Sequence, residues 1–282
     1  MKPILVFQTD FTYKEGAVAS MYGVVKSVDR ELEIVTATHE IPQYDTWSAS
    51  YRLDQYMGFW PKGTIFVSVV DPGVGTSRKA SVAKTKDGYY VVSPDNGSFT
   101  HVLYYHGIEE IRSIDESINR LKRADNGRVS IFHGRDLFAY CAARLASGII
   151  SYEEVGPTYE LEEIVVHDIA KATISEDGIS GIFEICDPNF GNLWTNIELD
   201  DFDKLFSYGD DIEVSIKHKD SEVYHDTIPY YSSFGMATEG SVMIYNNELN
   251  KIAMAIVKGN FLDNYNLGYG DSWCVTFRKV RK

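Results

Sequence analysis

The chain is poor in cysteine and has no long apolar run. Its 282 residues include three cysteines, Cys141, Cys186 and Cys274, and no Cys-x-x-Cys pair. Scattered cysteines in an odd number are typical of reduced, mostly buried thiols, so we expect a cytoplasmic protein. No stretch approaches the roughly 18 consecutive apolar residues that a membrane-spanning helix needs. The three residues before the first apolar run are too few for an export signal.

Basic residues are also scarce. Lysine and arginine together number 27 against 41 aspartates and glutamates, which gives a net charge of −14. Such a chain repels phosphate backbones and anionic lipids, so we expect neither nucleic acid nor a membrane surface as a partner. The charge by itself indicates solubility. Hydrophobic residues make up 44% of the chain, enough to bury one large core or two modest ones.

Apolar runs alternate with helical patterns in the first half of the chain. Continuous apolar runs predict strands at residues 4–7, 32–35 and 64–70, a hairpin over 81–92, and a strand near 129–132. Apolar residues three to four apart predict helices at residues 18–28, 45–57, 100–105 and 137–145. This alternation predicts an α/β domain over residues 1–165 with a mainly parallel sheet.

The pattern changes after residue 171. Short β-rich runs, broken by Gly, Asn and Asp, occur at residues 181–185, 211–217, 241–245, 251–257 and 272–278. Their spacing predicts a smaller, all-β second domain over residues 172–282.

Polar residues follow the predicted strands of the α/β domain, where such sheets place their ligand sites. After the first strand comes Thr9-Asp10-Phe11. Asp10 could accept hydrogen bonds from the two hydroxyls of a ribose, or it could be a helix cap or a turn residue.

A glycine-rich loop from Asp71 to Arg78 follows the third strand. Its Gly-x-Gly lacks the third glycine of a dinucleotide-binding fingerprint, and no Gly-Lys-Ser/Thr follows as in a P-loop. The loop does place a carboxylate and a guanidinium where they can pair. That pair is either a structural bridge or part of a site.

Two further motifs have both a plain and a functional interpretation. His133, in the segment Phe132 to Asp136, either packs at the start of a helix or contributes an imidazole to a site. The turn containing Phe190 and Asn192 is either a simple β-turn or a ligand contact. His39-Glu40 has no second histidine at the zinc-binding spacing, so we expect no metal.

In chain order, these motifs resemble the S-adenosyl-L-methionine (SAM) hydroxide adenosyltransferases, formerly DUF62, which are relatives of the fluorinase and chlorinase. The resemblance covers nearly the whole chain. It includes residues 9–11, 38–45, 71–78, 93–97, 132–138, 190–196 and 259–260. One such motif alone would be weak evidence for a family, whereas seven in the same order along the chain make the resemblance specific.

The resemblance implies a Rossmann-like N-terminal domain, a β-rich C-terminal domain and a homotrimer with its sites at subunit interfaces. The Asp–Arg–His triad of the hydrolytic members falls on Asp71, Arg78 and His133. The halogenases have Tyr at the first position and lack the histidine. The resemblance therefore implies that water attacks ribose C5′ and forms adenosine and methionine, with SAM as the substrate and no cofactor.

The same resemblance implies the residues that bind the substrate. Asp10 would take the ribose hydroxyls, Tyr44 would pack against the sugar or base, and Phe234 would stack on the adenine. Phe190 and Asn192 would come from the neighbouring subunit. Asn247 lies in a segment that matches a ligand-holding Asn-Ser stretch.

The chain departs from the family at three positions. Thr12 and Glu15 replace the usual Gly and Asp, and Glu248 stands where a serine often binds the substrate carboxylate. Glu248 would repel that carboxylate unless it points away. Three alternative functions stay open: a halide adenosyltransferase, a non-catalytic sensor of adenosine or SAM, and a structural trimer with a vestigial site. A halide would have to approach the negative charge of Asp71.

Overall fold

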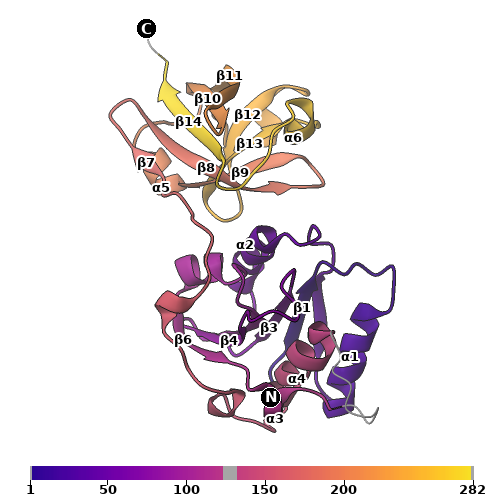
Figure 1. Cartoon of the computed structure of the whole chain (residues 1–282). Coiled ribbons are helices and arrows are strands. Elements are labelled where there is room, and N and C mark those ends of the chain that lie inside the picture. Colours follow the sequence, from indigo (N-terminus) through magenta and orange to yellow (C-terminus); the bar gives the residue numbers. More distant parts are fainter. Residues whose placement is uncertain (1, 123–131, 281–282) are drawn as a thin grey trace. The chain divides into compact units, whose positions relative to one another are not determined.

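The computed structural model describes residues 2–122 and 132–280 and has two compact units, Met1–His167 and Asp168–Lys282 (Figure 1). Apart from Phe132, the strand expected near residues 129–132 lies outside the described residues. The expected domain limits, 1–165 and 172–282, stay predictions.

The first unit contains a mixed six-stranded sheet in the order β2-β1-β3-β5-β4-β6. Strands β2, β1, β3 and β5 run parallel, while β4 is antiparallel to its neighbours β5 and β6. The strands are β1 (Leu5–Thr9), β2 (Ile34–Thr38), β3 (Ile65–Val69), β4 (Ala80–Thr85), β5 (Tyr90–Pro94) and β6 (Ile108–Ser113).

Helices cover both faces of this sheet. Phe7 of β1 packs in one core with α1 (Ala17–Val28) and α4 (Tyr140–Ala146). Its neighbour Val6 packs in another core with α2 (Thr46–Met57). Alternate residues of one strand thus face opposite layers, which explains why β1 and β3 are mostly apolar and buried throughout. Shorter helical segments are α3 (Glu116–Asn119), Val102–His106, Gly134–Ala139, Glu153–Val155 and Leu161–Glu163.

The second unit is built on an antiparallel, eight-stranded sheet in the order β11-β10-β14-β8-β9-β13-β12, with β7 on β8. A bridge between Tyr230 and Ile244 links the two ends of this order, so the sheet curls. Two short helices, α5 (Leu199–Phe202) and α6 (Phe261–Asn264), and the turn Phe234–Met236 accompany it. The strands are β7 (Thr173–Ile174), β8 (Gly178–Asp187), β9 (Asn192–Glu198), β10 (Asp211–His218), β11 (Ser221–Pro229), β12 (Val242–Asn246), β13 (Lys251–Ile256) and β14 (Trp273–Lys279).

Cys141 and Cys186 are buried, Cys274 is exposed, and all three are free thiols. Within residues 2–122 and 132–280, no helix combines the length and the apolar character that a membrane crossing requires.

Candidate active site

Polar residues gather at the carboxyl edge of the parallel strands in the first unit. His39 follows β2, Asp10 follows β1, and the loop of Asp71 follows β3. After β5, the Asn96 side chain donates to the carbonyl of Val70 at 3.0 Å and so fixes the start of that loop. Because parallel strands end at one edge, residues far apart in sequence meet there.

Arg78 joins Asp71 and His133. Its Nε donates to Asp71 Oδ1 at 2.9 Å, and its Nη2 bonds Asp71 Oδ2. The same Nη2 lies 2.9 Å from His133 Nδ1. The Arg78 and Asp71 side chains are only 9% and 7% exposed, and the guanidinium lies over the ring of Phe138, 5.3 Å from its centroid. The three side chains named from the sequence therefore form one connected, largely buried group.

The contact with Arg78 decides which nitrogen of His133 carries a proton. A guanidinium has only N–H donors, so His133 Nδ1 must accept the hydrogen bond. The neutral ring then carries its proton on Nε2. Burial and the nearby charge of Arg78 both lower the pKa of His133. The ring is therefore neutral at neutral pH and presents Nε2–H as a donor.

His133 precedes the helical turn Gly134–Ala139, but it is not merely a helix-start residue. As its N-cap residue, His133 makes no capping hydrogen bond with its side chain, and Asp136, in the first turn, is buried and paired with Arg135 at 2.6 Å. Phe132 packs edge-on against Phe11, with ring centroids 5.6 Å apart. That aromatic pair links the segment before His133 to the loop after β1.

Asp10 and Tyr44 also come together at this edge. The backbone N–H of Tyr44 donates to Asp10 Oδ2 at 2.9 Å, and the Tyr44 side chain is exposed. Burial raises the pKa of Asp10, the bond from Tyr44 opposes that change, and the charge of Asp71 adds to it.

In the second unit, three of the four residues named from the sequence line one pocket of about 660 Å³. Phe190 is 65% exposed, Asn192 is buried, and Phe234 packs against Tyr245 with ring centroids 4.9 Å apart. An exposed aromatic ring beside a buried amide suits a flat polar ligand. The lining residues are Asp187, Asn189, Phe190, Asn192, Phe234, Ile256, Lys258 and Gly259.

The fourth residue, Asn247, does not line this pocket. Its Oδ1 accepts from the backbone N–H groups of Leu249 and Lys251, at 2.9 and 3.0 Å, and so closes the turn between β12 and β13. Its buried Nδ2 has no hydrogen-bond partner among the described residues. The neighbouring Glu248 is exposed.

Sequence reasoning missed two charged residues of the pocket. Asp187 opens the turn that carries Phe190, and Lys258 directly precedes Gly259 of the last motif. Both residues adjoin motifs that were identified from the sequence, and this position was the signal that could have revealed them. Lys258 also has a positive φ of 54°, which no sequence pattern indicated.

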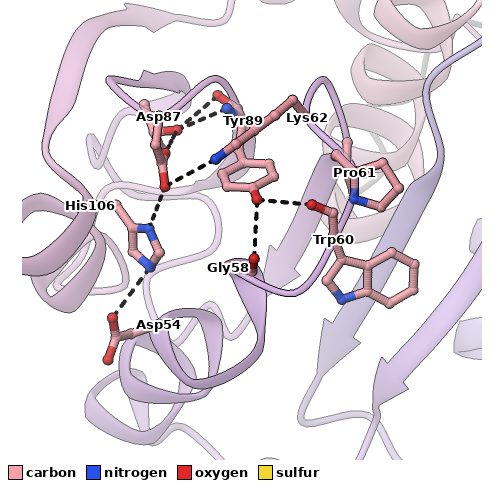
Figure 2. A network of polar contacts seen from close by, with 10 residues as sticks. Asp54, Gly58, Trp60, Pro61, Lys62, Asp87, Tyr89 and His106 are labelled. Carbon is pink, nitrogen blue, oxygen red and sulfur yellow. Dashed lines mark hydrogen bonds and ion pairs between the residues drawn. The ribbon is translucent and has the colours of Figure 1, made fainter. Parts of the chain in front are cut away.

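A second polar cluster, at the amino edge of the same sheet, was not predicted either (Figure 2). His106, just before β6, has its Nδ1 2.8 Å from Asp87 Oδ2 in the β4–β5 turn. Its Nε2 lies 3.3 Å from Asp54 Oδ1 on α2. The Nζ of Lys62, before β3, lies 3.7 Å from Asp87 Oδ2 and over the ring of Tyr89. This cluster ties α2 to the β4–β5 turn.

Comparisons with known proteins show what this chain is similar to. The chain is 36% identical to an (R)-S-adenosyl-L-methionine hydrolase of Methanocaldococcus jannaschii over 220 residues, 77% of this chain and 74% of that protein. It is 25% identical to a fluorinase of Actinopolyspora mzabensis over 98% of this chain and 97% of that protein. The crystal structure of an uncharacterized conserved protein from Thermotoga maritima matches with a TM-score of 0.86 and 31% identity, covering 98% of this chain and 100% of that one.

Family models extend the match to both units. The model of the SAM hydroxide adenosyltransferase N-terminal domain matches residues 5–156, and that of the C-terminal domain matches residues 182–274. The chain belongs to the SAM hydroxide adenosyltransferase family.

Proposed function

We propose that this protein hydrolyses SAM to adenosine and L-methionine, with water attacking ribose C5′. One observation carries the proposal: Arg78 holds an aspartate and a neutral histidine together at the carboxyl edge of the sheet. The sulfonium of SAM is already a good leaving group, so expelling it needs no acid. The weak nucleophile is the difficulty, and a positioned carboxylate and imidazole address it.

The roles follow from the hydrogen-bonding capacity of each group. Asp71 accepts a hydrogen bond from the attacking water, and His133 Nε2–H donates one to the water oxygen. As the O–C5′ bond forms, the C5′–S bond breaks, its electron pair stays on the methionine sulfur, and the water proton passes to Asp71. Arg78 keeps both partners oriented, because its rigid guanidinium binds them together. Such acid–base assistance is worth about 10²–10⁴-fold in rate.

The substrate would be held by residues of both units. Asp10 takes the ribose hydroxyls and Tyr44 packs against the sugar. Phe190 and Asn192 contact the ligand from a neighbouring subunit of a homotrimer, with Asn192 at the methionine end. Phe234 stacks on the adenine, and Asn247, whose Nδ2 has no hydrogen-bond partner among the described residues, supplies a donor. The shared pocket of Phe190, Asn192 and Phe234 supports this assignment.

The finer description of the fold belongs to the same proposal. Four neighbouring parallel strands with polar residues at their carboxyl ends support a Rossmann-like first domain. The antiparallel strand pairing supports an all-β class for the second, despite its two short helices. Three free cysteines support a reducing, cytoplasmic setting.

Turnover in ¹⁸O-labelled water tests the reaction. Label at the 5′-hydroxyl of adenosine is the expected result, because water oxygen ends on C5′. A second arm adds chloride. Main formation of 5′-chloro-5′-deoxyadenosine would overturn hydrolysis in favour of halide transfer, against which the negative charge of Asp71 argues. Tight SAM binding without turnover would identify a sensor instead.

A further inference from the structure

The loops that follow β1 and β2 are bound to each other along their length. The backbone N–H of Ile41 donates to the carbonyl of Thr9 at 3.3 Å, and that of Thr12 donates to the carbonyl of His39 at 2.8 Å. The bond from Tyr44 N–H to Asp10 Oδ2 continues the series. The position of the Asp10 carboxylate therefore depends on the segment from His39 to Tyr44.

His39 is the side chain at the centre of this contact. Its Nδ1 lies 2.8 Å from Thr9 Oγ1, whose oxygen also accepts the backbone N–H of Phe11 at 3.1 Å. Its Nε2 lies 2.8 Å from the hydroxyl of Tyr22 on α1. The residue is 1% exposed, and the ring of Tyr13 packs edge-on against it, with centroids 4.9 Å apart. Both ring nitrogens therefore have a hydrogen-bond partner, Thr9 at Nδ1 and Tyr22 at Nε2.

The loop needs such support because part of it is strained. Thr12 has a φ of 57°, a left-handed conformation that is unfavourable for a residue with a branched side chain. Surrounding contacts must therefore hold the backbone in this conformation. Burial lowers the pKa of His39 to about 4, so the ring stays neutral and keeps both hydrogen bonds at neutral pH.

We infer that His39 is a positioning residue for the reaction, which holds the Asp10 loop in the geometry that binds the ribose. It acts through Thr9 and Asp10 and does not touch the substrate. This inference rests on the proposed function, in which Asp10 binds the ribose hydroxyls. It gives a function to the motif Thr38 to Pro42, which the proposed mechanism leaves unused.

Three substitutions, His39→Ala, His39→Asn and His39→Gln, separate positioning from simple packing. The shorter amide of the asparagine variant reaches the place of Nδ1 and can keep the contact with Thr9. The longer amide of the glutamine variant reaches the place of Nε2 and can keep the contact with Tyr22. If His39 acts through Thr9, the asparagine variant recovers substrate binding and the glutamine variant does not.

The decisive experiment is a double-mutant cycle with Asp10→Ala, read as KM and kcat for SAM. We expect His39→Ala to raise KM about tenfold and to lower kcat less than about threefold, because the coupling acts through ribose binding. In the Asp10→Ala background the same change should matter less than about twofold. An equal effect in both backgrounds, or equal recovery by asparagine and glutamine, would overturn the inference.

Controls keep the result interpretable. His106→Gln changes another largely buried histidine of the same unit, at the other edge of the sheet, and should leave KM unchanged. Thermal unfolding of each variant identifies a change that only destabilises the chain. If the wild-type protein shows no turnover, the proposed function fails. The cycle can then be measured as adenosine binding by calorimetry. An absence of coupling between His39 and Asp10 in that measurement would still contradict the positioning role of His39.

Discussion

Two histidines at opposite edges of one sheet have partners of opposite charge. His133, at the carboxyl edge, faces the guanidinium of Arg78 at 2.9 Å. His106, at the amino edge, lies between the carboxylates of Asp87 and Asp54, at 2.8 and 3.3 Å (Figure 2). Burial acts on both rings in the same direction, so the sign of the partner's charge decides in which direction each pKa shifts.

The pKa values of the two rings shift in opposite directions. For His133, burial and the charge of Arg78 act together and lower the pKa. For His106, burial alone would lower the pKa, but the hydrogen bonds and charges of Asp54 and Asp87 outweigh it and raise the pKa. His133 is thus a neutral donor suited to chemistry, and His106 is the more readily protonated ring, suited to holding two carboxylates together.

The largest expected difference between the two edges is in turnover. His133→Ala or Asp71→Asn should lower kcat by about 10²–10⁴-fold, because the attacking water loses one of its two partners. SAM binding, measured by calorimetry, should survive. His106→Gln should change kcat less than about twofold, since no proposed step uses this edge. Near-normal turnover in both carboxyl-edge variants would remove the assigned mechanism.

Stability should depend more on the histidine at the amino edge than on the one at the carboxyl edge. His106→Ala leaves Asp54 and Asp87 without their shared partner, so unfolding in urea should be easier by about 1–3 kcal/mol. Kinetic constants of the folded variant should match the wild type. A variant as stable as the wild type would show that the amino-edge cluster contributes little.

The pH dependence of stability should also differ in sign. Because the folded pKa of His106 lies above its ordinary value of 6.5, its contribution is full below that pH and is lost as the pH rises through the folded pKa. The folded pKa of His133 lies below 6.5, so its contribution is present above that pH and is lost as the pH falls through the folded value.

Melting temperatures from about pH 5 to about pH 9 test this contrast. We expect the melting temperature of His106→Gln to fall less than that of the wild type as the pH rises. The melting temperature of His133→Gln should fall less than that of the wild type as the pH falls. Identical profiles for the two variants would mean that neither ring titrates as its partners predict.

Sequence patterns predicted the layers of the first unit well, because both faces of its sheet are buried. The continuous apolar runs at β1 and β3 fit only buried strands. The apolar spacing of α1 fits only a helix that packs on a sheet. Strand β6 was not predicted. Its Glu109, Glu110 and Arg112 conceal an edge strand in which apolar positions are few, and charges are typical of such edges.

The candidate site was predictable where its residues share a loop. Asp71 and Arg78 are seven residues apart on a glycine-rich loop, so pairing could be expected. The bond from Arg78 to His133 joins residues 55 apart and depends on how the helical turn before α4 meets the sheet. Neither spacing nor periodicity contains that information. The same holds for His39, whose role depends on a contact between two loops.

The smallest expected effects come from one methyl group added at each edge. At the carboxyl edge, a Cβ on Gly73 would lie 3.2 Å from Arg78 Cγ and 3.3 Å from Thr76 Oγ1. These side chains can yield by a few tenths of an ångström. Gly73→Ala should therefore cost little stability but move the guanidinium, which lowers kcat/KM by about fivefold.

At the amino edge, Gly88 has a φ of +94° and its nearest neighbour, Lys62 Cδ, would lie 3.7 Å from the added carbon. Space is sufficient there, but the backbone conformation is unfavourable for alanine. Gly88→Ala should cost about 1 kcal/mol of stability and leave kcat/KM unchanged. Urea unfolding and steady-state kinetics on both variants give the comparison. If Gly88→Ala impaired turnover while Gly73→Ala did not, the carboxyl edge would not be where the reaction occurs.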